Sequence, residues 1–99
     1  MFTKVARVGD VQVGRSKKVM VGDLEIALWN AKGRIYAINN VCPHQHFSSL
    51  HEGTLEGICV TCPMHGWSFS LETGEATSGG GKAFVYTVEV RGDQVFVDI

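Results

Sequence analysis

Hydrophobic and polar residues alternate along much of the chain in short runs that glycine interrupts, a period of two that is typical of β-strands. β-Branched residues dominate these runs, which favours strands further. The positions that carry the alternation are Val19, Val21, Ile26, Leu28, Ile35, Ala37, Val85, Val88, Val90, Val95 and Val97. We therefore predict an all-β protein.

Three glycine-containing dipeptides mark tight turns between the predicted strands. They are Gly22-Asp23, Lys32-Gly33 and Gly92-Asp93. Strands of this length and spacing predict an antiparallel β-sandwich or small barrel. The strands on either side of the first and last turns are expected at residues 17–21 and 24–30, and at residues 84–91 and 94–99.

The middle of the chain is richer in Gly, Pro, His, Ser and Thr than its two ends. Only residues 58–61 and 67–71 are strand candidates there. We predict one domain that spans residues 1–99 and has two parts. These are a β-base of residues 1–40 and 79–99, and a loop-rich, cofactor-binding insert at about residues 41–78.

Composition limits the classes of function. The chain has 99 residues, 44% of them hydrophobic and 19% charged, which describes an ordinary globular protein. Its net charge of -1 provides no basic surface for nucleic acid or anionic lipid. No apolar run approaches the roughly twenty residues of a membrane span, and residues 1–7 are too charged for a signal peptide. We expect a soluble, cytoplasmic monomer without a nucleic-acid or membrane partner.

Two short segments combine cysteine with histidine: Cys42-Pro43-His44 and Cys62-Pro63-Met64-His65. Each proline fixes its own φ and favours a turn, which allows closely spaced ligands to converge. Two thiolates and two imidazoles suit either a zinc ion or a 2Fe-2S cluster, in which the thiolates hold one iron and the imidazoles hold the other. Common zinc modules pair Cys with Cys and His with His, so the cluster is favoured.

The pattern Cys42-x-His44 followed by Cys62-x-x-His65-Gly66 resembles the Rieske signature, and the chain is similar in length to free-standing Rieske-type ferredoxins. The resemblance covers essentially the whole chain. It implies a Rieske-like iron-sulfur fold. It also implies that Cys42 and Cys62 bind the inner iron of a 2Fe-2S cluster, while His44 and His65 bind the outer iron near the surface.

The same resemblance implies a function as an electron carrier rather than an enzyme. Such a ferredoxin passes single electrons from a ferredoxin reductase to a terminal oxygenase of the aromatic-ring-hydroxylating type. The partners would dock transiently near His44 and His65. Two alternatives remain: the small subunit of a NADH-dependent nitrite reductase, which the chain also resembles, and a zinc-stabilised interaction module.

Four positions depart from the high-potential Rieske proteins of cytochrome bc complexes. Phe47 and Met64 stand where that group has two cysteines that form a disulfide, and Trp67 and Phe69 stand where it has a serine and a tyrosine. Without those hydroxyl donors the reduced cluster loses stabilisation. The resemblance therefore implies a low reduction potential, on the order of -150 mV.

Several nearby residues have a second interpretation. Cys59 lies at a Cys-x-x-Cys interval from Cys62, but alternation in its strand predicts a small sheet residue. His46 is a possible substitute for His44, although the Cys-x-His spacing favours His44. We expect His51 to be a solvated loop residue, and Trp67 and Phe69 to pack in the core rather than dock a partner.

Overall fold

The computed structural model describes residues 1–41, 50–63, 66–78 and 81–99. Within these ranges the regular structure is β-strand, apart from two 3-10 helices, η1 (Val8–Asp10) and η2 (Leu50–Glu52). The all-β prediction is confirmed. No helix in the described part of the chain is long and apolar enough to cross a membrane.

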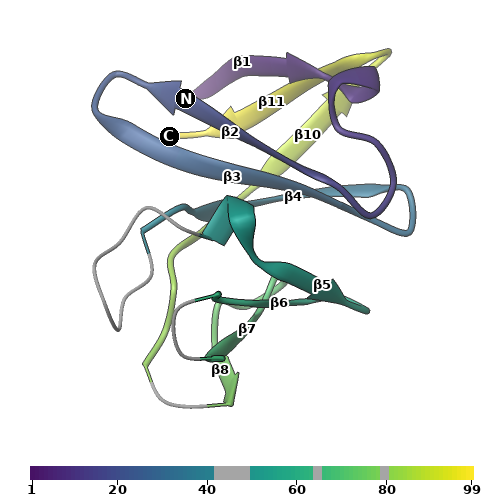
Figure 1. The fold of residues 1–99 in the computed structure, drawn as a ribbon. Coiled ribbons are helices and arrows are strands. Elements are labelled where there is room, and N and C mark those ends of the chain that lie inside the picture. The colour runs from purple at the N-terminus through teal and green to yellow at the C-terminus, as the bar shows by residue number, and fades with distance from the viewer. Residues whose placement is uncertain (42–49, 64–65, 79–80) are drawn as a thin grey trace.

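Three antiparallel sheets make up the fold (Figure 1). The first has the strand order β1-β11-β10 and the second β2-β3-β4-β9. The strands of the first sheet are β1 (Phe2–Arg7), β10 (Val88–Arg91) and β11 (Gln94–Asp98). Those of the second are β2 (Ser16–Val21), β3 (Leu24–Ala31), β4 (Arg34–Asn39) and β9 (Val85–Tyr86).

The predicted tight turns are confirmed by strand register. Val21 pairs with Leu24 across Gly22-Asp23, and Ala31 pairs with Arg34 across Lys32-Gly33. The link Gly92-Asp93 likewise joins β10 to β11. These hairpins fix which residues face each side of the sheets.

The prediction of one strand over residues 84–91 is wrong. β9 pairs with β4 in the second sheet, whereas β10 pairs with β11 in the first. Thr87 lies between them, and its carbonyl accepts a hydrogen bond from the Asp98 backbone N–H (2.9 Å). The alternation of apolar residues continues through this junction although the hydrogen-bonding partner changes, so periodicity alone does not reveal the break.

The third sheet has the order β5-β6-β7-β8, and Figure 1 shows it below the other two, with the helical turn η2 between it and β4. Only two strands were expected in this part of the chain, and the structure has four. All four strands are three residues long, but Ile58 beside β6 and Trp67 and Leu71 beside β7 extend the alternation of those two strands. The missed strands, β5 and β8, hold a single hydrophobic residue each and show no alternation. The strands are β5 (Thr54–Glu56), β6 (Cys59–Thr61), β7 (Ser68–Ser70) and β8 (Ala76–Ser78).

The central strand of the second sheet, β3, is buried on both faces because its residues enter two different cores. Along β3, Ile26 and Leu28 lie in a first core shared with the first sheet, whereas Ala27 and Trp29 lie in a second core shared with the third sheet. Strict alternation places successive residues on opposite faces of a strand. β3 thus holds the third sheet and the first sheet on opposite sides. The division into a base and an insert stays a prediction.

Candidate metal centre

Cys62 is the one predicted ligand that lies within the described residues. Cys42, His44 and His65 lie outside them, as do His46, Phe47 and Met64. The assignment of four ligands therefore stays a prediction. The described residues show Cys62 and the chain that flanks the two ligand segments.

Cys62 stands directly after β6, at the start of the link to β7. It is 1% exposed and belongs to the second core. Its backbone N–H donates to the Trp67 carbonyl (2.7 Å), and its own carbonyl accepts from Gly66 N–H (3.2 Å). Gly66 has a φ of +72°, a conformation that side chains disfavour and that lets the chain turn back into β7. Cys62 and Gly66 therefore lie at the two ends of the link that joins β6 to β7 in an antiparallel hairpin.

The first ligand segment leaves β4 and returns at η2, and both of its flanks are bonded to the second sheet. On the outgoing side, Asn40 N–H donates to the Glu25 carbonyl (2.9 Å). On the returning side, Leu50 N–H donates to the Asn40 carbonyl (3.1 Å), and the indole Nε1 of Trp29 donates to the Leu50 carbonyl (3.3 Å). The chain is thus held on each side of residues 42–49.

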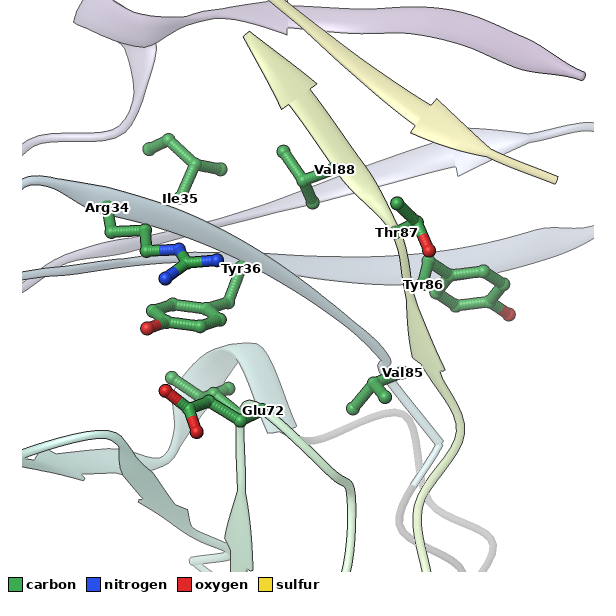
Figure 2. A pocket seen from close by; sticks show the side chains of 9 residues that line it. Arg34, Ile35, Tyr36, Glu72, Val85, Tyr86, Thr87 and Val88 are labelled. Atoms are coloured by element: carbon green, nitrogen blue, oxygen red, sulfur yellow. The ribbon is translucent and has the colours of Figure 1, made fainter.

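A pocket of about 460 Å³ opens between β4 and the segment that follows β7. Figure 2 shows Arg34 and Tyr36 reaching from β4 toward Glu72 on the opposite wall. The Arg34 guanidinium carbon lies 5.4 Å from the centre of the Tyr36 ring, a cation–π distance. Cys62 is not among the described residues that line this pocket.

Comparison of this chain with known proteins identifies its family and the kind of centre that the family implies. Residues 1–94 match the family described as Rieske [2Fe-2S] domain. The chain belongs to the Rieske family.

Relatives of nearly the same length share this Rieske sequence. The 3-phenylpropionate/cinnamic acid dioxygenase ferredoxin subunit of Escherichia coli (strain K12) is 38% identical over 95 residues, which cover 93% of this chain and 88% of the relative. A chain in the complex of reduced oxygenase and oxidized ferredoxin in carbazole 1,9a-dioxygenase superposes with a TM-score of 0.88 at 34% identity, covering 97% of this chain and 91% of that chain.

A third relative shares the Rieske fold alone. The putative NADH-dependent nitrite reductase small subunit from Mycobacterium tuberculosis has a TM-score of 0.89 at 22% identity, with 98% of this chain and 93% of that chain covered.

The Rieske family implies a 2Fe-2S cluster with cysteine and histidine ligands, and the described residues fit one. A thiol buried in an apolar core at a hairpin tip suits the inner, solvent-shielded iron. Within the described ranges no group of three or more His, Cys, Asp or Glu residues is placed to hold a metal ion.

Three expectations for neighbouring residues are confirmed. Cys59 is a half-buried sheet residue that pairs with Glu56 and Ser70. The Phe69 ring is fully buried in the second core, and Trp67 is partly buried against it. The two large aromatic side chains next to the Rieske ligand segment are thus packing residues.

The expectation for His51 is wrong. It lies in η2 rather than in a solvated loop, and its side chain is 23% exposed. Its backbone N–H donates to Asn40 Oδ1 (2.6 Å), and its ring Nε2 is 3.4 Å from Glu52 Oε1. Sequence reasoning missed Asn40 entirely, because a single asparagine at the end of a strand carries no signal that it is buried.

Proposed function

We propose that the chain is an electron-transfer ferredoxin. It takes single electrons from a ferredoxin reductase and passes them to a terminal oxygenase of the aromatic-ring-hydroxylating type, and it is not itself an enzyme. Support comes from the 38% identity to a dioxygenase ferredoxin subunit over 88% of that relative's length.

The observation that carries the proposal is the placement of Cys62, which is buried at the start of the link between β6 and β7. We assign Cys42 and Cys62 to the inner iron, and His44 and His65 to the outer iron. When bound, a 2Fe-2S cluster accepts and releases one electron at a time. The burial of Cys62 excludes water from the inner side, so exchange with a partner takes place on the histidine side.

A low reduction potential follows from the side chains that surround this hairpin. Phe69 is fully buried and has no hydroxyl to donate to the cluster or its ligands. Trp67 takes the place of the other hydroxyl donor of the high-potential group. The reduced, more negative cluster is therefore stabilised less, which favours a potential on the order of -150 mV.

The proposed partners are a reductase and an oxygenase that dock in turn near His44 and His65. The oxygenase is supported by the similarity to a chain in a complex of oxygenase and ferredoxin. A carrier that exchanges partners at each turnover needs weak contacts, so we expect a monomer with interfaces below about 1,200 Å². With its net charge of -1, the protein is proposed to act in the cytoplasm without binding nucleic acid or membranes.

The proposal is tested by reconstituting electron transfer. Purified protein is analysed for iron and acid-labile sulfide, reduced by a ferredoxin reductase with NADH, and mixed with a ring-hydroxylating oxygenase and its substrate. We expect two irons and two sulfides per chain and hydroxylated product that depends on the protein. A His65→Ala variant serves as the control without a complete ligand set. A colourless, zinc-loaded protein would sink the proposal.

The nitrite reductase alternative has support from the fold alone, at 22% identity. It predicts a stable complex with a large reductase and no transfer to any oxygenase. Tight co-purification with a nitrite reductase, together with failure to support hydroxylation, would reverse the ranking.

A further inference from the structure

Asn40 is a fully buried polar residue at the junction between β4 and the first ligand segment, two positions before Cys42. Burying an amide is costly unless each of its polar groups is hydrogen-bonded. Its contacts therefore indicate why an asparagine occupies this position.

The backbone and side chain of Asn40 together bind both flanks of residues 42–49. Its N–H donates to the Glu25 carbonyl (2.9 Å), and its carbonyl accepts from Leu50 N–H (3.1 Å). Its side-chain Oδ1 accepts from His51 N–H (2.6 Å) and lies 3.1 Å from His51 Nδ1. We call Asn40, Leu50 and His51 the Asn40 latch.

Two residues of the latch, Leu50 and His51, are also hydrogen-bonded to side chains of β2 and β3. The Leu50 carbonyl accepts from the buried indole of Trp29 (3.3 Å), and the His51 carbonyl accepts from the Ser16 hydroxyl (2.5 Å). Side chains of β2 and β3 thus bind the carbonyls of the 3-10 turn η2, while Asn40, directly after β4, binds its backbone N–H groups. Movement of the returning chain end would break several of these bonds together.

The orientation of the Asn40 amide is set by its neighbours. A backbone N–H requires an acceptor, so the atom that faces His51 N–H is the oxygen, Oδ1. The amide nitrogen Nδ2 is buried and has no hydrogen-bond partner in the described part of the chain. A buried donor of this kind is expected to have an acceptor in the functional protein. The sulfur atoms of an iron-sulfur centre are acceptors of the right chemistry.

We propose that Asn40 is a positioning residue of the cluster site with two tasks. Through Oδ1 it holds the end of the first ligand segment against the second sheet, and through Nδ2–H it donates to a sulfur atom of the centre. The inference concerns cluster binding, so it holds whether or not an oxygenase is the electron acceptor.

The first task is tested by Asn40→Leu with Asn30→Leu as the matched control. Asn30 is the other buried asparagine in the described ranges; its Nδ2 donates to the Val11 carbonyl (2.8 Å) and its Oδ1 accepts from Gly33 N–H (2.9 Å). Both variants lose two side-chain hydrogen bonds to other described residues and should lower the melting temperature. Only Asn40→Leu should accelerate loss of visible absorbance in a chelator, by about tenfold or more. Equal rates in the two variants would overturn the latch.

The second task is tested by Asn40→Asp with Asn39→Asp as the control. Aspartate at position 40 keeps oxygen acceptors for His51 but replaces the Nδ2–H donor, so the cluster should be retained. Asn39 is the neighbouring amide, with Oδ1 bonded to Val41 N–H (2.9 Å) and Nδ2 to the Tyr86 hydroxyl (3.2 Å). Asn39→Asp therefore adds the same charge one residue away without removing the proposed donor.

Two measurements distinguish the loss of the Nδ2–H donor from the effect of the added negative charge. Reduction should become less favourable in Asn40→Asp than in Asn39→Asp by about tenfold in the equilibrium constant, ~59 mV for a one-electron couple. Resonance Raman bands of the Fe–S bonds should shift between H₂O and D₂O in the wild type and in Asn39→Asp, and shift less in Asn40→Asp. An undiminished deuterium shift in Asn40→Asp would overturn the proposed donor. If Asn40→Leu does not fold, Asn40→Asp still decides, since loss of its cluster with native far-UV circular dichroism would also refute the proposal.

Discussion

Gly74 connects the turn after β7 to the strand segment that returns from residue 81. Its N–H donates to the Ser70 carbonyl (2.7 Å), and its carbonyl accepts from Ala83 N–H (2.8 Å). Its φ is +80°, and a Cβ added there would lie 2.0 Å from the Ala83 carbonyl oxygen. Because the obstacle is backbone, no side-chain rotation relieves the overlap, and Gly74→Ala must displace one of the two segments.

The magnitude follows by comparison with Gly57→Ala. Gly57 has a similar φ of +61°, but a Cβ there meets nothing within 4 Å. Both variants carry the left-handed conformational cost of about 1–2 kcal/mol. Gly74→Ala adds an overpacking cost of about 1–3 kcal/mol. In a chain of this size each kcal/mol lowers the melting temperature by roughly 4–8 °C.

The assay is thermal unfolding of both holo variants, followed by far-UV circular dichroism at one scan rate. We expect Gly74→Ala to melt at least about 4 °C below Gly57→Ala. The visible spectrum should weaken at the same time, because residues 81–83 adjoin the third sheet that carries Cys62. Equal melting temperatures would refute the argument from backbone overlap.

Three further predictions test the site and the core. His65→Cys replaces a neutral ligand with a thiolate, so redox titration should show a lower potential or loss of the cluster; an unchanged potential would contradict the ligand assignment. Cys59→Ser should leave iron content unchanged while Cys62→Ser loses it, and equal loss would contradict the assignment of Cys59 to the sheet. Phe69→Ala should cost about 3–5 kcal/mol in urea unfolding, whereas Phe84→Ala, at a ring site that is 65% exposed, should cost far less. Similar losses would contradict the core assignment.

The sequence contained enough local information to predict the hairpins and not enough to predict the sheet boundaries. The link Gly22-Asp23 is a local signal, because two residues must reverse the chain whatever surrounds them. The change of sheet at Thr87 depends on β4 and β11, which are distant in sequence. Three-residue strands such as β5 depend in the same way on their neighbour β6.

The candidate site shows the same contrast between local and distant information. The spacing of Cys62 and His65 is local and pointed to a metal centre, whereas the burial of Asn40 is created by segments from elsewhere in the chain. His51 was misplaced for this reason: its polarity predicts solvent, but its backbone N–H is needed to satisfy a buried amide oxygen. Buried polar residues such as Asn40, which hold the flanks of a site through contacts with distant segments, have no sequence motif.

The two tryptophans of the chain both belong to the second core, Trp29 buried within it and Trp67 packed against it, while the first core has none. Indole fluorescence is therefore a local probe of the half of the molecule that carries Cys62. A bound cluster that absorbs visible light should quench this emission, so its recovery would report cluster loss without an added dye. Far-UV circular dichroism reports all three sheets. Fluorescence and dichroism transitions that differ would show that loss of the cluster, or melting of this half, does not coincide with unfolding of all three sheets.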